Sequence, residues 1–265
     1  MKKMREGTEM NYARGVLSLI VCGLILLSGC QDDQSVHPQT ESEANSVQSE
    51  KLKQEMRQEF ERCLKAAESG DAMEQSNLGV LYANGVGVEQ DPFKAMEWYQ
   101  KAAKQGNRVG QYHIGTMYLN GEGVKQDHNQ AIEWFRKSAE QGFDAAQFNI
   151  GAMYRDGEGV KQDYRQALEW FRKAAEQQNA DAQYNLGFMY YKGEGVKQDL
   201  KQSLEWFRKS AEQGETDAQY NLGIMYANGK GVKQDYNQAV AWFRKAASQG
   251  HELAQETLSE LGESP

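Results

Sequence analysis

The chain has 265 residues, of which 39% are hydrophobic and 26% are charged, and its formal net charge is −8. This acidic balance, with no basic stripe along the chain, argues against a nucleic-acid partner. Three cysteines are too few for a disulfide framework.

Residues 1–29 are predicted to be a lipoprotein signal peptide. A basic start is followed by an apolar run from Val16 to Leu27, which at about 12 residues is shorter than a membrane span. The run ends in Leu27-Ser28-Gly29-Cys30, which resembles the bacterial lipobox. This resemblance implies cleavage before Cys30 and attachment of lipid to its thiol and new amine. The alternatives are an uncleaved anchor and an ordinary signal peptide with a chance cysteine.

The residue after the cysteine indicates the destination. An aspartate at this position would resemble an inner-membrane retention signal, but this chain has Gln31. We therefore expect a lipoprotein of the outer membrane that faces the periplasm and contacts the membrane only through its lipid. Loss of the signal peptide, with its four basic and two acidic residues, changes the formal net charge from −8 to −10. Cys63 would then be the free thiol of the mature chain.

Two segments are expected between the signal peptide and the first repeat. Residues 30–50 are polar and are predicted to form a disordered tether, because they have too few apolar residues to bury. Residues 51–70 are predicted to form an N-terminal capping helix. Phe60, Cys63 and Leu64 lie one period before an apolar helix face, but Arg62 occupies the place of a tryptophan.

Residues 71–250 contain a 36-residue period that occurs five times. Its clearest marks are five glycines and five tryptophans at constant spacing. The glycines are Gly79, Gly115, Gly151, Gly187 and Gly223, and the tryptophans are Trp98, Trp134, Trp170, Trp206 and Trp242. The apolar residues around each glycine have helical spacing. Glycine costs about 1 kcal/mol inside a helix, so its recurrence predicts close approach of a neighbouring helix.

A second helix is predicted in each period, after a turn of the form Gly-x-Gly-Val. Asp163 followed by Gln166 is typical of a capping box, and three further copies repeat this pair. Asp91 followed by Pro92 starts the first copy. Most copies end in glycine, but the third has Gln178 at that position. Each period is therefore a helix–turn–helix pair that buries its apolar faces against its neighbours.

The motif Ala-Gln-x-x-Leu-Gly-x-x-Tyr, then Gly-x-Gly-Val, Asp and Trp-Phe/Tyr-x-Lys-Ala/Ser-Ala-x-x-Gly, resembles the SEL-1-like repeat, a relative of the tetratricopeptide repeat. The resemblance implies an all-α, right-handed α-solenoid that binds other proteins. We expect it to be a monomer. Residues 251–265 are predicted to form a C-terminal capping helix, in which Leu258 occupies the apolar position of the first helices and Ser259 replaces their recurring glycine.

No catalytic, metal or cofactor site is expected. The four histidines lack a second ligand at metal-binding spacing, and the usual hydrolase motifs are missing. The recurring carboxylates are typical of helix caps and solvated helix faces. Some cysteine-rich members of the repeat family are assigned as β-lactamases, but they carry a cysteine pair in each repeat and this chain does not. We predict that the chain is not an enzyme.

The partner site is predicted on the exposed side of the first helices, which by resemblance to tetratricopeptide arrays lines a concave groove. Residues that point away from the buried side there at about 100° per residue form an aromatic row flanked by more variable residues. The predicted site residues are Tyr112, Phe148, Arg155, Tyr184, Phe188, Tyr191 and Tyr220. The alternative is that the row packs between repeats. Phe188, Tyr191 and Arg155 differ between copies, so they are the stronger candidates.

The predicted function is a lipid-anchored scaffold or adaptor of the cell envelope that binds a partner protein or peptide. Two alternatives remain open. One is a secreted hydrolase that acts on β-lactam-like or peptidoglycan-like substrates, and the other is an immunity protein that sequesters its partner.

Overall fold

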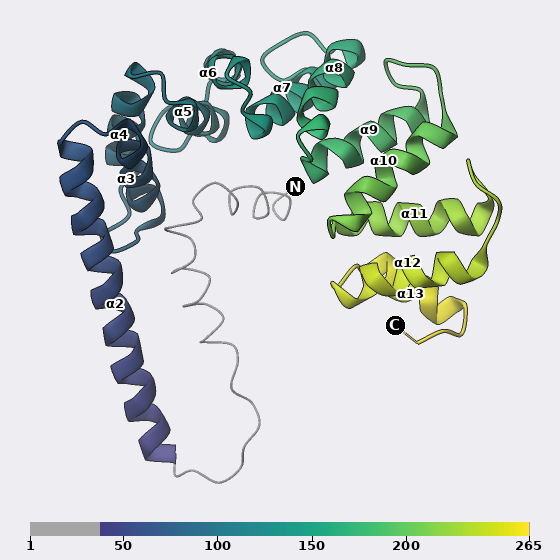
Figure 1. Cartoon of the computed structure of the whole chain (residues 1–265), viewed down its shortest axis with the longest axis horizontal. Helices are drawn as coiled ribbons and strands as arrows, with labels where there is room; N and C mark the ends of the chain where they lie inside the picture. Colours follow the sequence, from purple (N-terminus) through teal and green to yellow (C-terminus); the bar gives the residue numbers. More distant parts are fainter. Residues whose placement is uncertain (1–37, 265) are drawn as a thin grey trace. The chain divides into compact units, whose positions relative to one another are not determined.

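The computed structural model describes residues 38–264, with side chains from residue 48 onward. Twelve helices and no strand form this part of the chain, and the helices follow one another as pairs of near-constant length (Figure 1). This confirms the predicted all-α solenoid of repeating helix pairs. The chain divides after Trp134 into two compact units. Cys30 and the predicted signal peptide lie outside the described residues.

The helices of each repeat are short and regular. The helices through the second repeat are α2 (Pro38–Glu68), α3 (Ala72–Asn84), α4 (Pro92–Lys104), α5 (Arg108–Asn120) and α6 (His128–Glu140). Those that follow are α7 (Asp144–Asp156), α8 (Tyr164–Glu176), α9 (Ala180–Lys192), α10 (Leu200–Glu212), α11 (Thr216–Asn228), α12 (Tyr236–Ser248) and α13 (Glu252–Glu260).

The long helix α2 corrects the predicted start of the ordered chain. The sequence predicts a disordered tether up to residue 50, but α2 begins at Pro38, so that prediction is wrong for residues 38–50. The physical reason is that the later turns of α2 are anchored by packing, and extending a nucleated helix needs far less than starting one. The glutamate-, glutamine- and alanine-containing sequence of residues 38–50 suits such an extension.

The anchored part of α2 packs on α3 (Figure 1). Cys63 and Ala67 are fully buried, and Phe60 meets Tyr82 edge to face with ring centroids 5.4 Å apart. Arg62 is exposed and pairs with Glu59 on its own helix. Burial raises the pKa of the Cys63 thiol to about 12, so this cysteine is a packing residue and stays protonated.

The recurring glycine in each first helix makes room for the ring of the second helix. A Cβ on Gly151 would lie 2.7 Å from Cδ1 of Phe171, and one on Gly187 would lie 2.6 Å from Cδ1 of Phe207. Both rings are fully buried. The prediction that glycine serves close helix approach is therefore confirmed, and the approaching helix is the second one of the same repeat.

The start of each second helix confirms one half of the predicted capping box. Asp163 caps α8, because its side chain accepts hydrogen bonds from the backbone N–H groups of Arg165 and Gln166. The reciprocal bond from Gln166 is not formed. Instead the Asp163 backbone N–H donates to the carbonyl of Tyr154 across the turn at 2.8 Å. The turn already satisfies this donor, so the glutamine side chain has no role in the cap.

A buried glutamine in each first helix joins three helices. Gln183 in α9 donates to the carbonyl of Ala175 in α8 at 3.1 Å, and its side-chain oxygen accepts from Gln213 at the end of α10 at 2.8 Å. The same pair of bonds recurs at Gln147 and at Gln219. We refer to this arrangement as the glutamine staple. The sequence motif contains this residue, but its spacing alone does not indicate the bonds.

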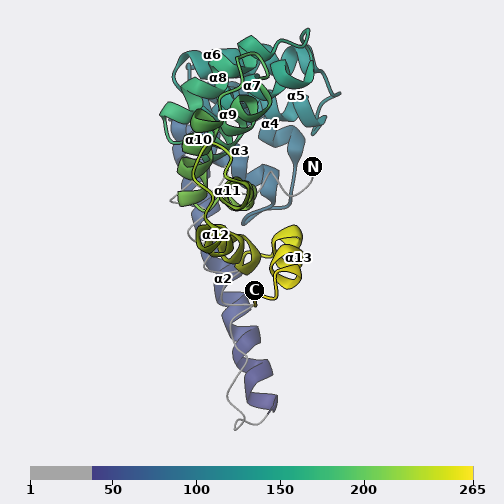
Figure 2. The ribbon, with the colours of Figure 1, turned by 90° about the vertical axis from the view of Figure 1, so that its right-hand side faces the viewer.

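Arginine side chains make a second link between successive repeats. Arg172 in α8 donates to the hydroxyl of Tyr190 in α9 at 3.1 Å, and Arg208 in α10 donates to that of Tyr226 in α11 at 2.8 Å. After the last full repeat, α13 packs beside α12 and buries Leu258 (Figures 1 and 2). There Arg244 donates to Glu263 at 2.6 Å instead of to a tyrosine.

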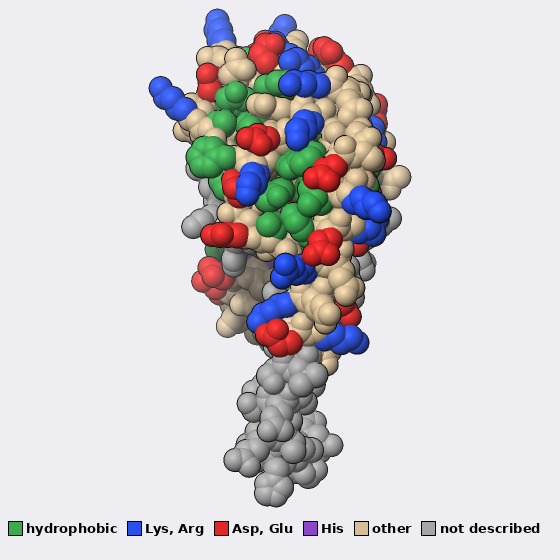
Figure 3. Space-filling model, turned by 90° about the vertical axis from the view of Figure 1, so that its left-hand side faces the viewer, with side chains coloured by type: hydrophobic (Ala, Val, Ile, Leu, Met, Phe, Trp, Pro, Cys, Tyr) green, Lys and Arg blue, Asp and Glu red, His purple; other side chains and the backbone are tan. Residues whose placement is uncertain are grey.

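The surface mixes charges of both signs. On the face drawn in Figure 3, lysine and arginine side chains alternate with aspartates and glutamates around smaller apolar areas. Within residues 38–264, no helix combines the length and apolar character needed to cross a membrane.

Candidate functional site

The predicted partner site lies on the first helices, and most of its residues belong to the second unit. We define the first-helix face as the outward side of α7, α9 and α11, where equivalent positions of the repeats recur 36 residues apart. It contains the predicted residues Phe148, Arg155, Tyr184, Phe188, Tyr191 and Tyr220. Tyr112 belongs to α5 in the first unit, where its ring centroid lies 5.3 Å from that of His113.

The aromatic row is half-buried in the interior of the repeats. The rings of Phe148, Tyr184 and Tyr220 lie 5.6–5.7 Å from those of Phe171, Phe207 and Phe243, which are the second-helix rings of the same repeats. Such tilted contacts stabilise the pair of helices. The row therefore has a packing role within each repeat, and only its outer edges are available to a partner.

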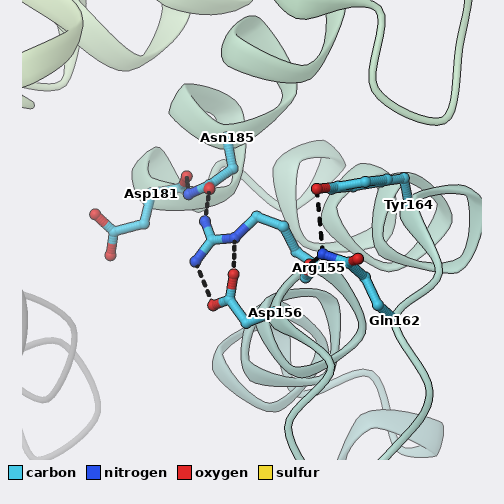
Figure 4. A network of polar contacts seen from close by, with 6 residues as sticks. All are labelled: Arg155, Asp156, Gln162, Tyr164, Asp181 and Asn185. Carbon is cyan, nitrogen blue, oxygen red and sulfur yellow. Dashed lines mark hydrogen bonds and ion pairs between the residues drawn. The ribbon is translucent and has the colours of Figure 1, made fainter.

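Arg155 is held by side chains of its own unit (Figure 4). Its guanidinium donates to both carboxylate oxygens of Asp156, at 2.8 and 2.7 Å, and a third N–H donates to the side-chain oxygen of Asn185 in α9. The Asp156 carboxylate raises the pKa of Arg155. This arginine thus links α7 to α9 and also lies at the edge of the first-helix face.

Tyr191 has a partner that the sequence did not reveal. Its hydroxyl accepts a hydrogen bond from Lys230, which also lies 5.0 Å from the ring centroid. Lys230 occupies the middle of a Gly-x-Gly turn where the three preceding copies have glutamate. The tyrosine and the lysine are each peculiar to one copy, and they meet across 39 residues.

Phe188 is the one predicted site residue with an exposed side chain, at 36%. Lys192 lies over its ring, 5.6 Å from the centroid, one helical turn further along α9. An aromatic ring that is neither part of the core nor covered by another helix is a typical anchor for a protein partner.

Carboxylates at the starts of α9 and α11 were not among the predicted site residues. Glu215 is the N-cap of α11 and accepts from the N–H of Ala218. Burial, with a smaller contribution from Asp217 and Asp181, raises its pKa to about 7. Burial also raises the pKa of Asp181. A comparison of equivalent positions in the repeats could have identified two of them, because Asp181 and Asp217 replace the Val109 and Ala145 of earlier copies.

A model of the Sel1 repeat matches residues 75–107, 109–143, 144–179, 180–215 and 216–251. The chain belongs to the Sel1 repeat family. No curated protein matches it in sequence. Among solved structures, a protective antigen of uropathogenic Escherichia coli that displays this fold is 41% identical, with a TM-score of 0.73. That match covers 76% of this chain but 43% of the antigen, so this chain spans less than half of its length.

A second solved structure is similar over nearly its whole length. It is a Sel1 repeat protein from Oxalobacter formigenes, 31% identical, with a TM-score of 0.72, and the match covers 82% of this chain and 86% of that one. A third, from Klebsiella pneumoniae, is 23% identical with a TM-score of 0.51 and shares the fold alone. The Sel1 repeat is a scaffold for protein–protein interaction, and proteins built from it are generally not enzymes.

The last Sel1 repeat is joined to α13 by a histidine. His251 caps α13 by accepting from the N–H of Ala254 at 3.1 Å, and its other ring nitrogen lies 3.2 Å from a carboxylate oxygen of Asp217. Its ring stacks on Tyr220 with centroids 4.6 Å apart. The described residues hold no group of three His, Cys, Asp or Glu side chains suited to a metal ion. His251 thus caps α13 and links it to the last repeat through Asp217 and Tyr220.

Proposed function

We propose that the chain is a Sel1 scaffold that binds a partner protein or peptide on its first-helix face and has no catalytic activity of its own. The observation that carries the proposal is Phe188, a large aromatic side chain left exposed in the middle of α9. Tyr184 and Tyr191 lie about one turn before and after it on α9, and both are half-buried. Aromatic side chains of this kind dominate the energetics of protein interfaces.

Affinity capture with a matched pair of variants tests the proposal. The full-length chain, its Phe188→Ala variant and its Phe93→Ala variant are used as baits. Phe93 is 69% exposed but belongs to the second helix α4, so it controls for loss of any surface aromatic. We expect a partner that the wild type and Phe93→Ala retain and Phe188→Ala loses. Equal capture by all three baits would show that the first-helix face is not the binding surface.

We further propose that lipid on Cys30 holds the protein at the outer membrane, facing the periplasm, as a monomer. The lipobox-like Leu27-Ser28-Gly29-Cys30 and the following Gln31 support this proposal. Cells fed an alkyne-bearing fatty acid should label the wild-type protein and not a Cys30→Ala variant. The labelled protein should co-sediment with the outer membrane and resist protease added to intact cells. Labelling that persists in Cys30→Ala would refute the anchor, and digestion on intact cells would indicate surface display.

A further inference from the structure

The first-helix face of the second unit changes character along the array. The outward side of α9, α11 and α13, with the N-cap of α11, carries carboxylates and apolar side chains, whereas α7 has Ala145 and Ala152 where α9 has Asp181 and Phe188. The carboxylates are Asp181, Glu215, Asp217, Glu256 and Glu260, and the apolar side chains are Phe188, Ile224 and Leu253. Leu253 is 54% exposed, so two of the large exposed apolar side chains of the protein lie on this face. We call it the acidic face.

Two of the carboxylates at the starts of α9 and α11, Asp181 and Glu215, have no lysine, arginine or histidine partner among the described residues. The Asp181 carboxylate forms no hydrogen bond or ion pair with any described residue, and in Figure 4 it points away from the Arg155 guanidinium. Glu215 accepts from backbone N–H groups, and Asp217 pairs with His251. Burial raises the pKa of both Asp181 and Glu215, which means that their ionised forms are poorly compensated.

The arginine and the lysines of this face contact residues other than these carboxylates. Arg155 is neutralised by Asp156, and Lys230 donates to Tyr191. Lys192 lies over the ring of Phe188. All three lie at or beyond the C-terminal ends of their helices, whereas Asp181, Glu215 and Asp217 lie at the N-terminal ends. The negative charge at those ends therefore remains available to a ligand.

We propose that the acidic face binds a protein segment that presents a lysine or arginine next to a large apolar side chain. The basic group would be received by Asp181, Glu215 and Asp217, and the apolar one by Phe188 and Ile224. This inference rests on the proposed scaffold function and specifies the chemistry of the partner. Phosphate-bearing partners such as nucleic acids and anionic membranes would be repelled by the same carboxylates.

Helix geometry gives the spacing that such a segment needs. Asp181 and Phe188 are seven residues apart on one side of α9, which is roughly 10 Å along the helix axis. An extended peptide covers the same distance in about three residues. The expected recognition element is therefore a basic residue and a large apolar residue about three positions apart.

Selection from a random peptide library tests both the charge and the spacing. The immobilised full-length chain is the target, in parallel with a variant that carries Asp181→Asn, Glu215→Gln and Asp217→Asn. A second variant, Glu169→Gln with Glu205→Gln, removes exposed carboxylates from the second helices and serves as the matched control. Far-ultraviolet circular dichroism verifies that all three proteins are equally helical.

We expect peptides selected on the wild type to be enriched in Lys or Arg about three positions from an aromatic or large aliphatic residue. The best peptide should bind the triple variant at least about tenfold more weakly and the control variant within about twofold. Its affinity should also fall as salt concentration rises.

The outcomes separate this inference from the function on which it rests. Peptides that bind through Phe188 but lack basic residues, or that bind the triple variant as tightly as the wild type, would overturn the acidic face and leave the scaffold function standing. Failure to select any peptide on the wild type would count against both.

Discussion

Gln177 at the end of α8 donates a 2.8 Å hydrogen bond to the side-chain oxygen of Gln147 in the middle of α7. Gln147 in turn donates to the carbonyl of Ala139 in α6 at 3.2 Å, and its side chain is buried. One amide therefore holds three successive helices together. Each repeat of a solenoid contacts only its neighbours, so these bonds contribute directly to the coupling between repeats.

Replacement of Gln147 by leucine should weaken that coupling. The substitution keeps the side-chain volume but leaves the Gln177 amide without its buried acceptor, so we expect a loss of about 1–2 kcal/mol in the free energy of unfolding. Urea denaturation followed by circular dichroism measures this change. Glu176→Gln is the control, because it alters an exposed neighbour and should stay within about 0.5 kcal/mol. A Gln147→Leu protein as stable as the wild type would refute the staple as a stabilising element.

Replacement of Gln178 by glycine should stabilise the protein. Gln178 has φ 67°, the left-handed conformation that its equivalents Gly142, Gly214 and Gly250 adopt freely. A non-glycine residue there costs about 1 kcal/mol, so Gln178→Gly should raise the free energy of unfolding by about that amount. A Cβ on Gly142 would meet no atom within 4 Å, so the reverse change, Gly142→Gln, should destabilise through the backbone conformation. Changes of the same sign in the two variants would contradict this explanation.

Replacement of Gly187 by alanine should destabilise the fourth repeat, although alanine favours helices by about 1 kcal/mol. The new Cβ would lie 2.6 Å from Cδ1 of Phe207, whose ring is fully buried. Overpacking of this kind costs about 1–3 kcal/mol. Combining Gly187→Ala with Phe207→Leu tests the cause, since the two losses should be less than additive. Full additivity would mean that the ring is not what the alanine meets.

The buried cap Glu215 should make stability depend on pH. Its pKa is about 7 in the folded chain and 4.5 ordinarily. Between these values the folded state binds more protons than the unfolded state, so the free energy of unfolding should fall as pH rises from about 5 to about 8. We expect a fall of about 1–3 kcal/mol from this group, with Asp181, Asp217 and Tyr184 as the ionisable neighbours that contribute to its environment.

A neutral cap at the same position provides the comparison. Asn179 caps α9 through its side-chain oxygen, so Glu215→Asn should keep the cap, remove the pH dependence of this position and stabilise the protein at pH 8. Urea denaturation at pH 5 and pH 8 measures both effects. An unchanged pH dependence in Glu215→Asn would show that another group titrates.

The sequence predicted the features that depend on local chemistry and on the period. The aspartate caps of the second helices, the glycine turns and the helix approach at Gly151 are confirmed, because each requires one residue type at one position. The prediction of a disordered tether up to residue 50 was wrong, because composition describes an isolated segment and not one that continues an anchored helix. The prediction of a reciprocal capping bond was wrong, because the N-cap backbone N–H donates to a carbonyl across the turn, and residue spacing does not reveal that contact.

The predicted partner site was less accessible to such reasoning. Angular position on a helix places Phe188 outward, and the structure agrees. Angular position does not reveal which residues the end of a long side chain contacts. Arg155 reaches Asn185 across 30 residues and Lys230 reaches Tyr191 across 39, so two apparent binding residues also serve as internal links. Their binding role stays a prediction. Asp181 and Glu215 became notable only through their burial.

The glutamine staple also bears on how such an array can change its length. A copy of 36 residues carries both an amide that reaches back to the preceding helix and a glutamine at its end that secures its own first helix. A duplicated or deleted copy would therefore bring or remove a complete joint, and the flanking copies would meet across an unchanged interface. Variation in copy number can thus alter the span of the binding surface in single genetic steps without inventing new contacts.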